Sequence, residues 1–399
     1  WTRDVIPGIS NSADSGSTEL IQETLDNTTA DTVSVTYHFT LAANGCSANH
    51  EDIAVLVAPT PVLNNPVLHD TMCNDMIFKD TVTSNTPGTL FYWERDTVAG
   101  ITPLANSDAD SIIIDSLHNA TSNPIDVVYA ITLQEPNGCP YTQSLIVTVY
   151  PTPALNTTLD TASCSNASFV YQAGSATTLA TLSWIRDSVP GIGNSPAIGN
   201  SGLINEVLTN TTDTAVIVTY LINLKIGNCT YQQSVTDTVN PVLHLSSALS
   251  AAVCNGSIFN YNALSPNAKY FSWTRDADAF GNSANSSDTS VVNEALHNTS
   301  VDPIVVTYKF TLTTSDSLCS NTEFVNVTVN PTPKVDTVAD KFYCHGDSVA
   351  AITLTSQTPG AVLSWTCSDP IGLFPMTGTG SIPAFEAANA GTSPIEATI

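Results

Sequence analysis

Four arginines stand in one repeated tetrapeptide, Trp-x-Arg-Asp, and the chain holds no other arginine. On a strand, side chains two residues apart point to the same face, so an inward tryptophan brings the arginine inward with it. A buried guanidinium requires an anionic partner. An acidic residue follows each arginine 19 or 20 positions later, which predicts four structural ion pairs. The pairs are Arg3 with Glu23, Arg95 with Asp115, Arg186 with Glu206, and Arg275 with Glu294.

A second interpretation treats each arginine and the aspartate after it as a clamp for a ligand or a sugar. A feature that recurs on the same strand of every repeat is explained more simply by a shared core than by a shared ligand. The last repeat agrees with this, since Cys367 stands at the arginine position and Phe385 at the acidic position, with Glu386 one residue off register. We therefore favour the ion pair and keep the clamp as the alternative.

Five tryptophans set the period of the chain. They are Trp1, Trp93, Trp184, Trp273 and Trp365, separated by 92, 91, 89 and 92 residues. A fixed period overrides a domain count based on length alone, and this one matches the size of an immunoglobulin-like sandwich. We expect a tandem array of modules with one tryptophan in each core.

Proline-rich joints divide the array. Pro-Thr-Pro stands at 59–61, 151–153 and 331–333, each time after an alternating apolar stretch, and Asn-Pro-Val at 240–242 is a weaker copy. An alternating run that meets proline is a strand that ends. The predicted repeats are 1–60 (start missing), 61–152, 153–241, 242–332 and 333–399 (end missing). We accordingly expect a segment of a longer protein.

Short alternating runs dominate each repeat, and turn residues separate them every 8 to 12 positions without helical periodicity of useful length. This pattern predicts an all-β fold built of sandwiches of about 90 residues. The net charge of -26 argues against nucleic acid and anionic membranes as partners. The hydrophobic share of 42% supplies material for cores and argues against disorder.

Eight of the nine cysteines fall into two periodic sets, which indicates a disulfide framework. One set is Cys73, Cys164, Cys254 and Cys344, and the other is Cys46, Cys139, Cys229 and Cys319. Pairing could join sequence neighbours, partners within a module, or partners across a junction. In a sandwich of this kind the first two options place the thiols about 33 Å apart or more, the length of a ten-residue strand. We therefore predict Cys73 with Cys229 and Cys164 with Cys319, and keep free buried thiols as the alternative.

Sequence motifs of catalysis are absent: we find no nucleophile elbow, zinc-protease motif, P-loop or dinucleotide fingerprint, and the seven histidines are scattered. We predict no enzyme activity and no cofactor. Two acidic clusters, Asp108-Ala109-Asp110 and Asp276-Ala277-Asp278, offer oxygen ligands of the kind that Ca²⁺ prefers. Neither completes a calcium-loop motif, so a solvated acidic loop is favoured and Ca²⁺ stays the alternative.

Asp followed by Ser or Thr and then a small or apolar residue occurs 13 times, against roughly three expected by chance for this composition. The triplet resembles the O-glycan acceptor of secreted Bacteroidota proteins. Turn and strand initiation by Asp and Thr explains it equally well. The candidate acceptors are Thr32, Thr71, Thr81, Thr97, Ser111, Ser116, Thr161, Ser188, Thr214, Thr238, Ser317, Thr337 and Ser348.

The repeats resemble the PKD-like, immunoglobulin-like modules of giant Bacteroidota surface proteins, including gliding-motility adhesins. The resemblance rests on the Trp-x-Arg-Asp strand, the strand at 35–41, the Asn-Gly-Cys turn at 44–46 and the Pro-Thr-Pro joints, and it extends over the whole chain. The family's usual Trp-Asp-Phe-Gly-Asp strand is replaced here by Trp-x-Arg-Asp. The resemblance implies a PKD-like fold, export by the type IX system and a location at the cell surface.

We expect a structural stalk segment of a large extracellular adhesin, which projects a binding tip and bears tension. A self-associating filament or sheath is the alternative, and a carbohydrate-binding module of a secreted enzyme is a weaker one. The expected partners are neighbouring modules of the same chain, surface glycans or other copies of the chain. Nucleic acid and membrane insertion are not expected, since the longest apolar runs have the length of strands.

Overall fold

The computed structural model describes residues 1–46, 50–64, 68–136, 138 and 140–399. In these ranges the chain folds into strands joined by turns and bends, with no α-helix. A membrane-spanning helix, long and apolar, is therefore not found among the described residues. Cys139, one of the periodic cysteines, lies outside the described residues.

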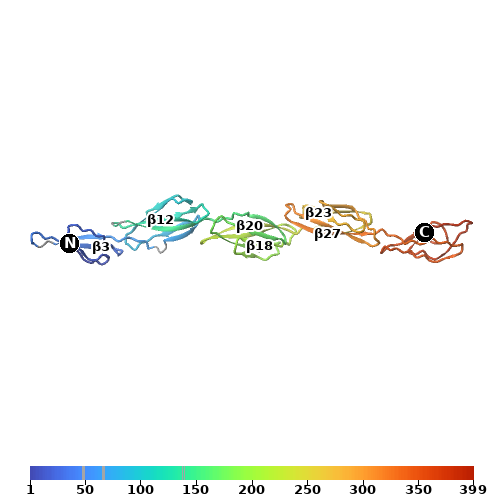
Figure 1. Cartoon of the computed structure of the whole chain (residues 1–399), viewed down its shortest axis with the longest axis horizontal. Coiled ribbons are helices and arrows are strands. Elements are labelled where there is room, and N and C mark those ends of the chain that lie inside the picture. The colour runs from blue at the N-terminus through green and yellow to red at the C-terminus, as the bar shows by residue number, and fades with distance from the viewer. Residues whose placement is uncertain (47–49, 65–67, 137, 139) are drawn as a thin grey trace.

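The strands form five groups that follow one another along one long axis, with the chain termini near opposite ends of the molecule (Figure 1). We call these groups modules 1 to 5. Module 1 holds β1 (Thr2–Arg3), β2 (Asp14–Ser15), β3 (Val33–Thr40) and β4 (His50–Val57). Module 5 holds β28 (Ser348–Val349), β29 (Ser364–Thr366), β30 (Thr377–Thr379) and β31 (Phe385–Glu386).

Modules 2, 3 and 4 have the larger sheets. Module 2 comprises β5 (His69–Cys73), β6 (Ile77–Thr81), β7 (Leu90–Arg95), β8 (Ile101–Thr102), β9 (Asn106–Asp108), β10 (Ile112–Ser116), β11 (His118–Asn119), β12 (Ile125–Gln134) and β13 (Tyr141–Tyr150). Module 3 comprises β14 (Asp160–Cys164), β15 (Ser168–Gln172), β16 (Thr181–Arg186), β17 (Ala197–Gly199), β18 (Leu203–Val207), β19 (Val216–Ile226) and β20 (Cys229–Asn240). Module 4 comprises β21 (Ser250–Cys254), β22 (Ile258–Asn262), β23 (Tyr270–Arg275), β24 (Asn285–Ser287), β25 (Val291–Ala295), β26 (Ile304–Thr313) and β27 (Ser320–Asn330).

Each of these three modules packs a two-stranded sheet against a five-stranded one. In module 3 the large sheet has the order β14-β20-β19-β16-β17, and the small sheet pairs β15 with β18. Alternate residues of β19 point inward, and Val218, Tyr220 and Ile222 are fully buried. They meet Trp184 of β16 and Ile204 of β18 in one apolar cluster. Each such side chain stabilises the fold by roughly 1.5–3 kcal/mol through removal from water.

Parallel pairing of the first and last strands sets the direction of each module. β14 runs parallel to β20, and Cys164 lies opposite Asn240 at their shared C-terminal ends. Cys229 begins β20 at the opposite end, where it faces Ile226 across the β19–β20 hairpin. We call these the C-terminal and N-terminal poles of the module, because the chain enters at one and leaves at the other.

Buried asparagines tie the connection before each long strand to the end of the sheet. The side-chain amides of Asn119, Asn210 and Asn298 donate to the main-chain carbonyls of Val149, Val239 and Val329 at 2.9, 2.8 and 2.8 Å. In module 3 the amide nitrogen of Asn210 also donates to the main-chain carbonyl of Thr214. The amide oxygen of Asn210 accepts from the main-chain N–H and the hydroxyl of Thr212. Asn-x-Thr/Ser at these three places is therefore a structural motif, and its amide has no room for a glycan.

We predict that Asn210→Ala destabilises module 3 by about 1–3 kcal/mol, because buried main-chain groups at both ends of the connection lose their partner. Hydrogen-exchange mass spectrometry of the intact chain should show faster exchange in β18 to β20 while modules 2 and 4 keep their protection. Asn200→Ala, at an exposed turn of the same module, is the matched control and should leave protection unchanged. Equal protection in both variants would contradict a structural role for Asn210.

Candidate functional site

Each Trp-x-Arg-Asp strand places its arginine in a closed cluster. Arg186 is 1% exposed, and its Nε and Nη2 donate to the two carboxylate oxygens of Glu206 at 2.8 Å each. Nη1 and Nη2 also donate to the carbonyls of Asp187 and Ser195. The guanidinium is thus satisfied by one carboxylate and by main-chain oxygens of the loop that follows β16, so it fixes the shape of that loop.

The same cluster recurs in four modules. Arginine Nε lies 2.9 Å from Glu23 for Arg3, 2.7 Å from Asp115 for Arg95, and 3.1 Å from Glu294 for Arg275. In every case Nη1 donates to the carbonyl of the next aspartate, while that aspartate residue is exposed. The structure therefore brings each arginine to its predicted acidic partner and leaves the aspartate side chain outside the cluster.

Module 5 departs from this pattern. Cys367 takes the place of the arginine and is buried with Trp365, Leu373 and Ile382. Phe385 packs against this cluster, while Glu386 is exposed. An apolar core here occupies the positions that hold charged partners in the other modules.

A tyrosine to which the sequence motifs assign no role completes each cluster. Tyr220 donates its hydroxyl to Glu206 at 2.7 Å, and its ring meets Trp184 edge-on at 5.6 Å between centroids. The corresponding residues are Tyr37, Tyr129 and Tyr308, which bond Glu23, Asp115 and Glu294. In all four modules the tyrosine stands 14 residues after the carboxylate. That constant spacing is the signal that could have revealed it.

Three of the clusters lower the pKa of their glutamate, namely Glu23, Glu206 and Glu294. The Arg3 guanidinium lowers the pKa of Glu23 to about 2. Burial acts to raise the pKa of Glu206, but hydrogen bonds from Arg186 and Tyr220 outweigh it, and the pKa lies below its ordinary value. Burial, with the neighbouring Glu23, raises the pKa of Tyr37 to about 12. The stability that ionised Glu23 contributes is present above about pH 4.3 and is lost as the pH falls towards its folded-state pKa of about 2.

The tryptophans of modules 1 to 4 occupy equivalent places. Trp93, Trp184 and Trp273 are buried, and Trp1 is partly buried against Tyr37. The tryptophan ring, the tyrosine ring and the ion pair thus form one continuous stack from core to loop. The stack holds the loop in place, and the side chains of its ion pairs are each 13% exposed or less.

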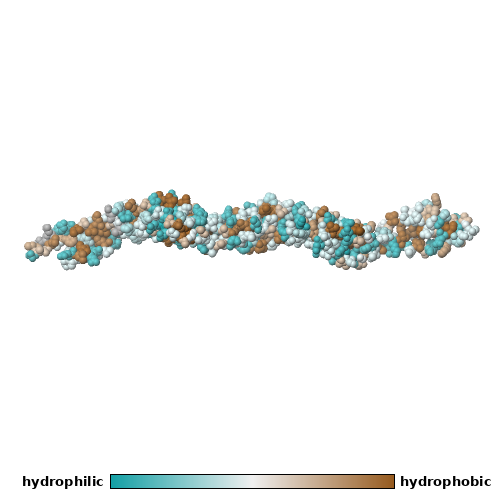
Figure 2. Space-filling view, turned by 90° about the horizontal axis from the view of Figure 1, so that it is seen from above, coloured by the Kyte–Doolittle hydropathy of each residue, from teal (hydrophilic) through white to brown (hydrophobic). Residues whose placement is uncertain are grey.

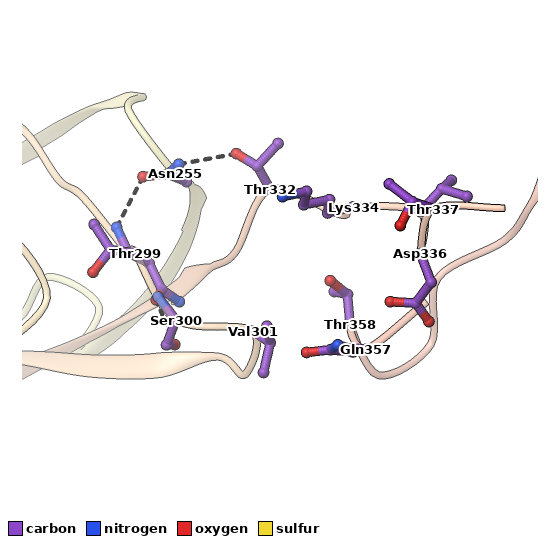
Figure 3. Close-up of a pocket in the computed structure, with 12 residues that line it drawn as sticks. Asn255, Thr299, Ser300, Val301, Thr332, Lys334, Asp336, Thr337, Gln357 and Thr358 are labelled. Carbon is purple, nitrogen blue, oxygen red and sulfur yellow. Dashed lines mark hydrogen bonds between the residues drawn. The ribbon is translucent and has the colours of Figure 1, made fainter. Parts of the chain in front are cut away.

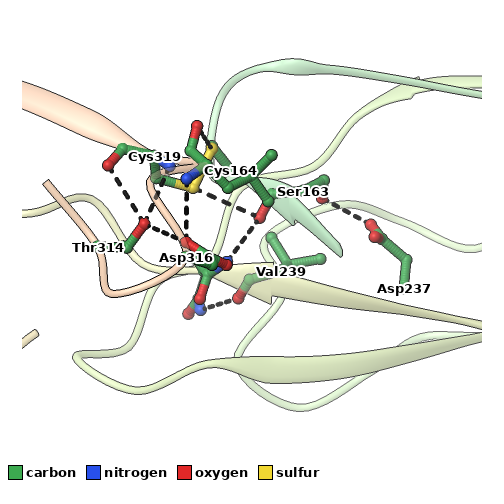
Figure 4. The surroundings of a disulfide bond; sticks show 10 residues. Ser163, Cys164, Asp237, Val239, Thr314, Asp316 and Cys319 are labelled. Atoms are coloured by element: carbon green, nitrogen blue, oxygen red, sulfur yellow. Dashed lines mark hydrogen bonds between the residues drawn. A yellow bond between two sulfur atoms is a disulfide. The ribbon is translucent and has the colours of Figure 1, made fainter. Parts of the chain in front are cut away.

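Two disulfides cross the junctions between modules. Cys73 of module 2 bonds Cys229 of module 3, and Cys164 of module 3 bonds Cys319 of module 4, both with Cα atoms 5.6 Å apart. Figure 4 shows the second bridge, where Thr314 and Asp316 order the turn that carries Cys319. Among the described cysteines, Cys46, Cys254 and Cys344 are unpaired and exposed, and Cys367 is unpaired and buried.

Further contacts accompany both bridges. Thr178 of module 3 donates to Asn123 of module 2 at 3.0 Å, and Asn267 of module 4 donates to the carbonyl of Asp213 of module 3 at 2.5 Å. Gly227 lies so close to Tyr150 that a Cβ atom would stand 2.4 Å from its ring. These contacts fix the two junctions on more than one side.

The junction between modules 4 and 5 is open by comparison. A cavity of about 560 Å³ lies there, lined mainly by hydroxyl and amide side chains together with Lys334 and Asp336 (Figure 3). Pro359 of module 5 stands where module 3 has Thr178 and has no side-chain donor. Within the described residues, no disulfide spans this junction.

The carboxylates of the two acidic clusters accept hydrogen bonds from residues of their own loops. Asp278 accepts from the main chain of Phe280 at 2.8 Å and from Asn282, and Asp108 accepts from the main chain of Ala109 at 2.7 Å. In the part of the chain that the structure describes, no group of three or more His, Cys, Asp or Glu side chains is placed to hold a metal ion.

The candidate glycan acceptors lie mostly at the surface. Ser111, Thr161 and Thr238 are half-buried, and Thr161 donates its hydroxyl to the carbonyl of Thr236 at 2.8 Å. The remaining ten candidates are exposed, namely Thr32, Thr71, Thr81, Thr97, Ser116, Ser188, Thr214, Ser317, Thr337 and Ser348.

Asp237 is a buried acid that the repeat pattern does not explain. It is fully buried on β20, where β13 and β27 have Val147 and Val327, and it accepts from Ser163 at 2.6 Å (Figure 4). Burial raises the pKa of this carboxyl, and hydrogen bonds from Ser163 and Thr161 offset only part of that effect. Its charged form therefore weakens module 3.

We predict that Arg186→Met lowers the stability of module 3 by about 3–5 kcal/mol, since Glu206 is left buried without its counter-charge. The double variant Arg186→Met, Glu206→Leu should recover more than half of the loss. Chemical denaturation of the intact chain, followed by hydrogen exchange in module 3, measures both. A single variant as stable as the parent would favour the ligand-clamp interpretation.

We predict that Asp237→Asn becomes more stable than the parent as the pH rises from about 4 to 8. A carboxyl with a raised pKa in the folded state stabilises the fold only while protonated, and that contribution disappears as the pH rises through the folded pKa. Hydrogen-exchange protection of β14 and β20, corrected for the intrinsic rate at each pH, measures the difference. A difference that does not change with pH would show that Asp237 titrates normally.

Comparison with known proteins gives one family and a set of structural neighbours. The insect immune protein hemolin is 12% identical, with 82% of this chain and 93% of that chain covered and a TM-score of 0.27. A three-immunoglobulin-domain segment of titin is 10% identical, covering 68% and 98%, with a TM-score of 0.34. A segment of Drosophila N-cadherin is 10% identical, covering 83% and 91%, with a TM-score of 0.24. No curated protein matches the sequence.

Residues 70–153 match the PKD-like domain family, a range that holds β5 to β13 of module 2. Modules 1, 3 and 4 repeat its Trp-x-Arg-Asp motif, and modules 3 and 4 also repeat its five-stranded sheet. The predicted fold class is confirmed: the chain is an all-β tandem array of PKD-like, immunoglobulin-like sandwich modules.

Proposed function

We propose that the chain is a structural stalk segment of a large secreted adhesin at the cell surface, which holds a binding tip away from the cell and bears tension. The observation that carries this proposal is the end-to-end row of modules in which two successive junctions are closed by disulfides (Figure 1). Disulfides of this kind are typical of proteins outside the reducing cytosol. The proposal includes the division of the chain into repeats that end at residues 60, 152, 241 and 332.

The strand order suits a chain under tension. Because β14 and β20 are parallel, and the chain enters before one and leaves after the other, a pull along the axis loads their hydrogen bonds together. The same pairing occurs between β5 and β13 and between β21 and β27. Bonds loaded together resist extension better than bonds opened one after another. The array therefore has the mechanical design of a tether.

The surface supports an extended, soluble stalk. All four arginines are buried, so six lysines are the only basic side chains besides histidine outside the clusters, against an acidic total of 36. Like charges on neighbouring modules favour separation. The exposed acceptor hydroxyls are consistent with a glycosylated protein. The finer assignment, a gliding-motility adhesin of a Bacteroidota organism exported by the type IX system, rests on the motif resemblance.

A self-associating filament is the second candidate, and one observation favours it. The small sheets expose aliphatic residues on their outer faces: Ile77 and Ile114 in module 2, Val170 and Val207 in module 3, and Ile258 and Val291 in module 4 are each about half to two-thirds exposed. In modules 3 and 4, among the residues that the structure describes, each strand of the small sheet pairs with one other strand. Apolar patches recur along the molecule between hydrophilic ones (Figure 2). Exposed edges and apolar faces are the usual route to lateral association.

We predict that duplication of residues 153–332 lengthens the particle by about 80 Å, since it adds two modules of about 40 Å each, and leaves it monomeric. Small-angle X-ray scattering and sedimentation velocity measure these properties on the purified chain. On cells, the duplication should increase the distance of the tip from the surface without changing target binding. Concentration-dependent lateral assembly would favour the filament, and altered target binding would place recognition within these modules.

A further inference from the structure

The connectivity of the two disulfides points to a mechanical property beyond rigidity of the junctions. We propose that they form a short covalent path that carries tension past modules 2, 3 and 4, so that the unfolding of one of these modules does not lengthen the chain. The biological use of this property rests on the proposed stalk function. The property itself belongs to the isolated chain.

Each bridge joins the C-terminal pole of one module to the N-terminal pole of the next. Cys73 lies opposite Tyr150 at the end of the β5–β13 pair, and Cys164 lies opposite Asn240 at the end of the β14–β20 pair. Their partners stand in the hairpin turns at the other pole: Cys229 begins β20, and Cys319 precedes β27. Tension that reaches the C-terminal pole of one module can therefore pass through the disulfide to the next module, without passing through the main chain that links the two.

The path across modules 2 and 3 is short. It runs from Leu63 to Cys73, crosses the bridge, and continues along β20 from Cys229 to Asn240. These roughly 23 residues reach about 80 Å when fully extended. Two folded modules, each about as long as the 12-residue strand β20, span about the same distance at 3.3 Å per residue. Unfolding of these two modules would therefore add almost no length to the chain.

Without the bridge, the same two modules would release far more. The chain from Leu63 to Asn240 reaches roughly 600 Å when extended, so loss of both folds would add about 500 Å. The bridge closes a loop with a sequence separation of 156 residues, and that loop takes no part in the shortened path. The disulfide thus changes the extensible length several-fold.

The two bridges overlap in sequence, and this extends the protection to module 4. Cys164 lies between Cys73 and Cys229, and its bridge to Cys319 has a separation of 155 residues. While module 3 is folded, tension passes from its C-terminal pole through Cys319 and along β27 to Asn330. Module 4 is then bypassed in the same way. If all three modules unfold, the shortest covalent path gives roughly 200 Å of added length instead of about 800 Å.

A purely stabilising role for the disulfides predicts a different outcome. A cross-link that closes a long loop stabilises the fold by lowering the entropy of the unfolded chain. That effect raises the force at which a module opens and leaves the length released on opening unchanged. The released length, not the force, therefore tests the covalent path.

The experiment is single-molecule force spectroscopy on the whole chain, pulled from its two ends. In the oxidised chain we expect modules 2, 3 and 4 to contribute no separate step of full module length. Modules 1 and 5, which no disulfide bridges within the described residues, should still extend and serve as internal references. Cys229→Ser should restore a step of roughly 270 Å for module 2. The double variant Cys229→Ser, Cys319→Ser should restore such steps for all three modules.

Cys254→Ser with Cys344→Ser is the matched control, because both residues are exposed and unpaired, and it should behave as the parent. Circular dichroism and hydrogen exchange confirm that each variant is folded before pulling. Three full-length steps from modules 2 to 4 in the oxidised parent would overturn the proposal. That result would overturn the covalent path but not the proposed stalk function. Conversely, if the duplication of residues 153–332 abolished target binding on cells while the released lengths stayed as expected, the stalk function would be contradicted and the covalent path would not.

Discussion

The parallel pairing of the first and last strands is the constraint on which the remaining architecture depends. It places the arrival and departure of the chain at opposite poles, so modules can only follow one another in a row. It also places Cys164 and the end of β20 together at one pole and Cys229 at the other. An antiparallel arrangement of the same two strands would bring both termini of a module to one end, and the bridges could not link neighbours in series.

Much of this could be predicted from the sequence because the determinants are periodic. Trp184 and Arg186 share a face by the geometry of a strand, and the acid 19 or 20 residues later lies within reach in each complete cluster. The cysteine sets were informative because only one of the three registers fits the length of a strand. Repetition supplied, within a single sequence, the kind of comparison that is normally made among relatives.

Other features are harder to predict from the sequence, for two different reasons. One group recurs as regularly as the arginines: the tyrosine of each cluster, and the anchoring asparagine, which is Asn210 in module 3. Because Tyr and Asn-x-Thr are common in strands and loops, their spacing stands out less from the background of the sequence. Asp237 differs, because a single polar residue replaces an apolar one in an otherwise regular strand. Its partner Ser163 lies on a strand 74 residues away in sequence, and only the fold brings the two together.

The burial of all four arginines has an effect far from the cores that they serve. Removing these cations from the surface leaves carboxylates there with few counter-charges. At physiological ionic strength such charges repel one another over about 8 Å. In a dense layer of these chains, charge repulsion would therefore set the spacing between neighbours, wider in dilute salt and narrower as salt rises, while the disulfides and folded modules set the length of each chain.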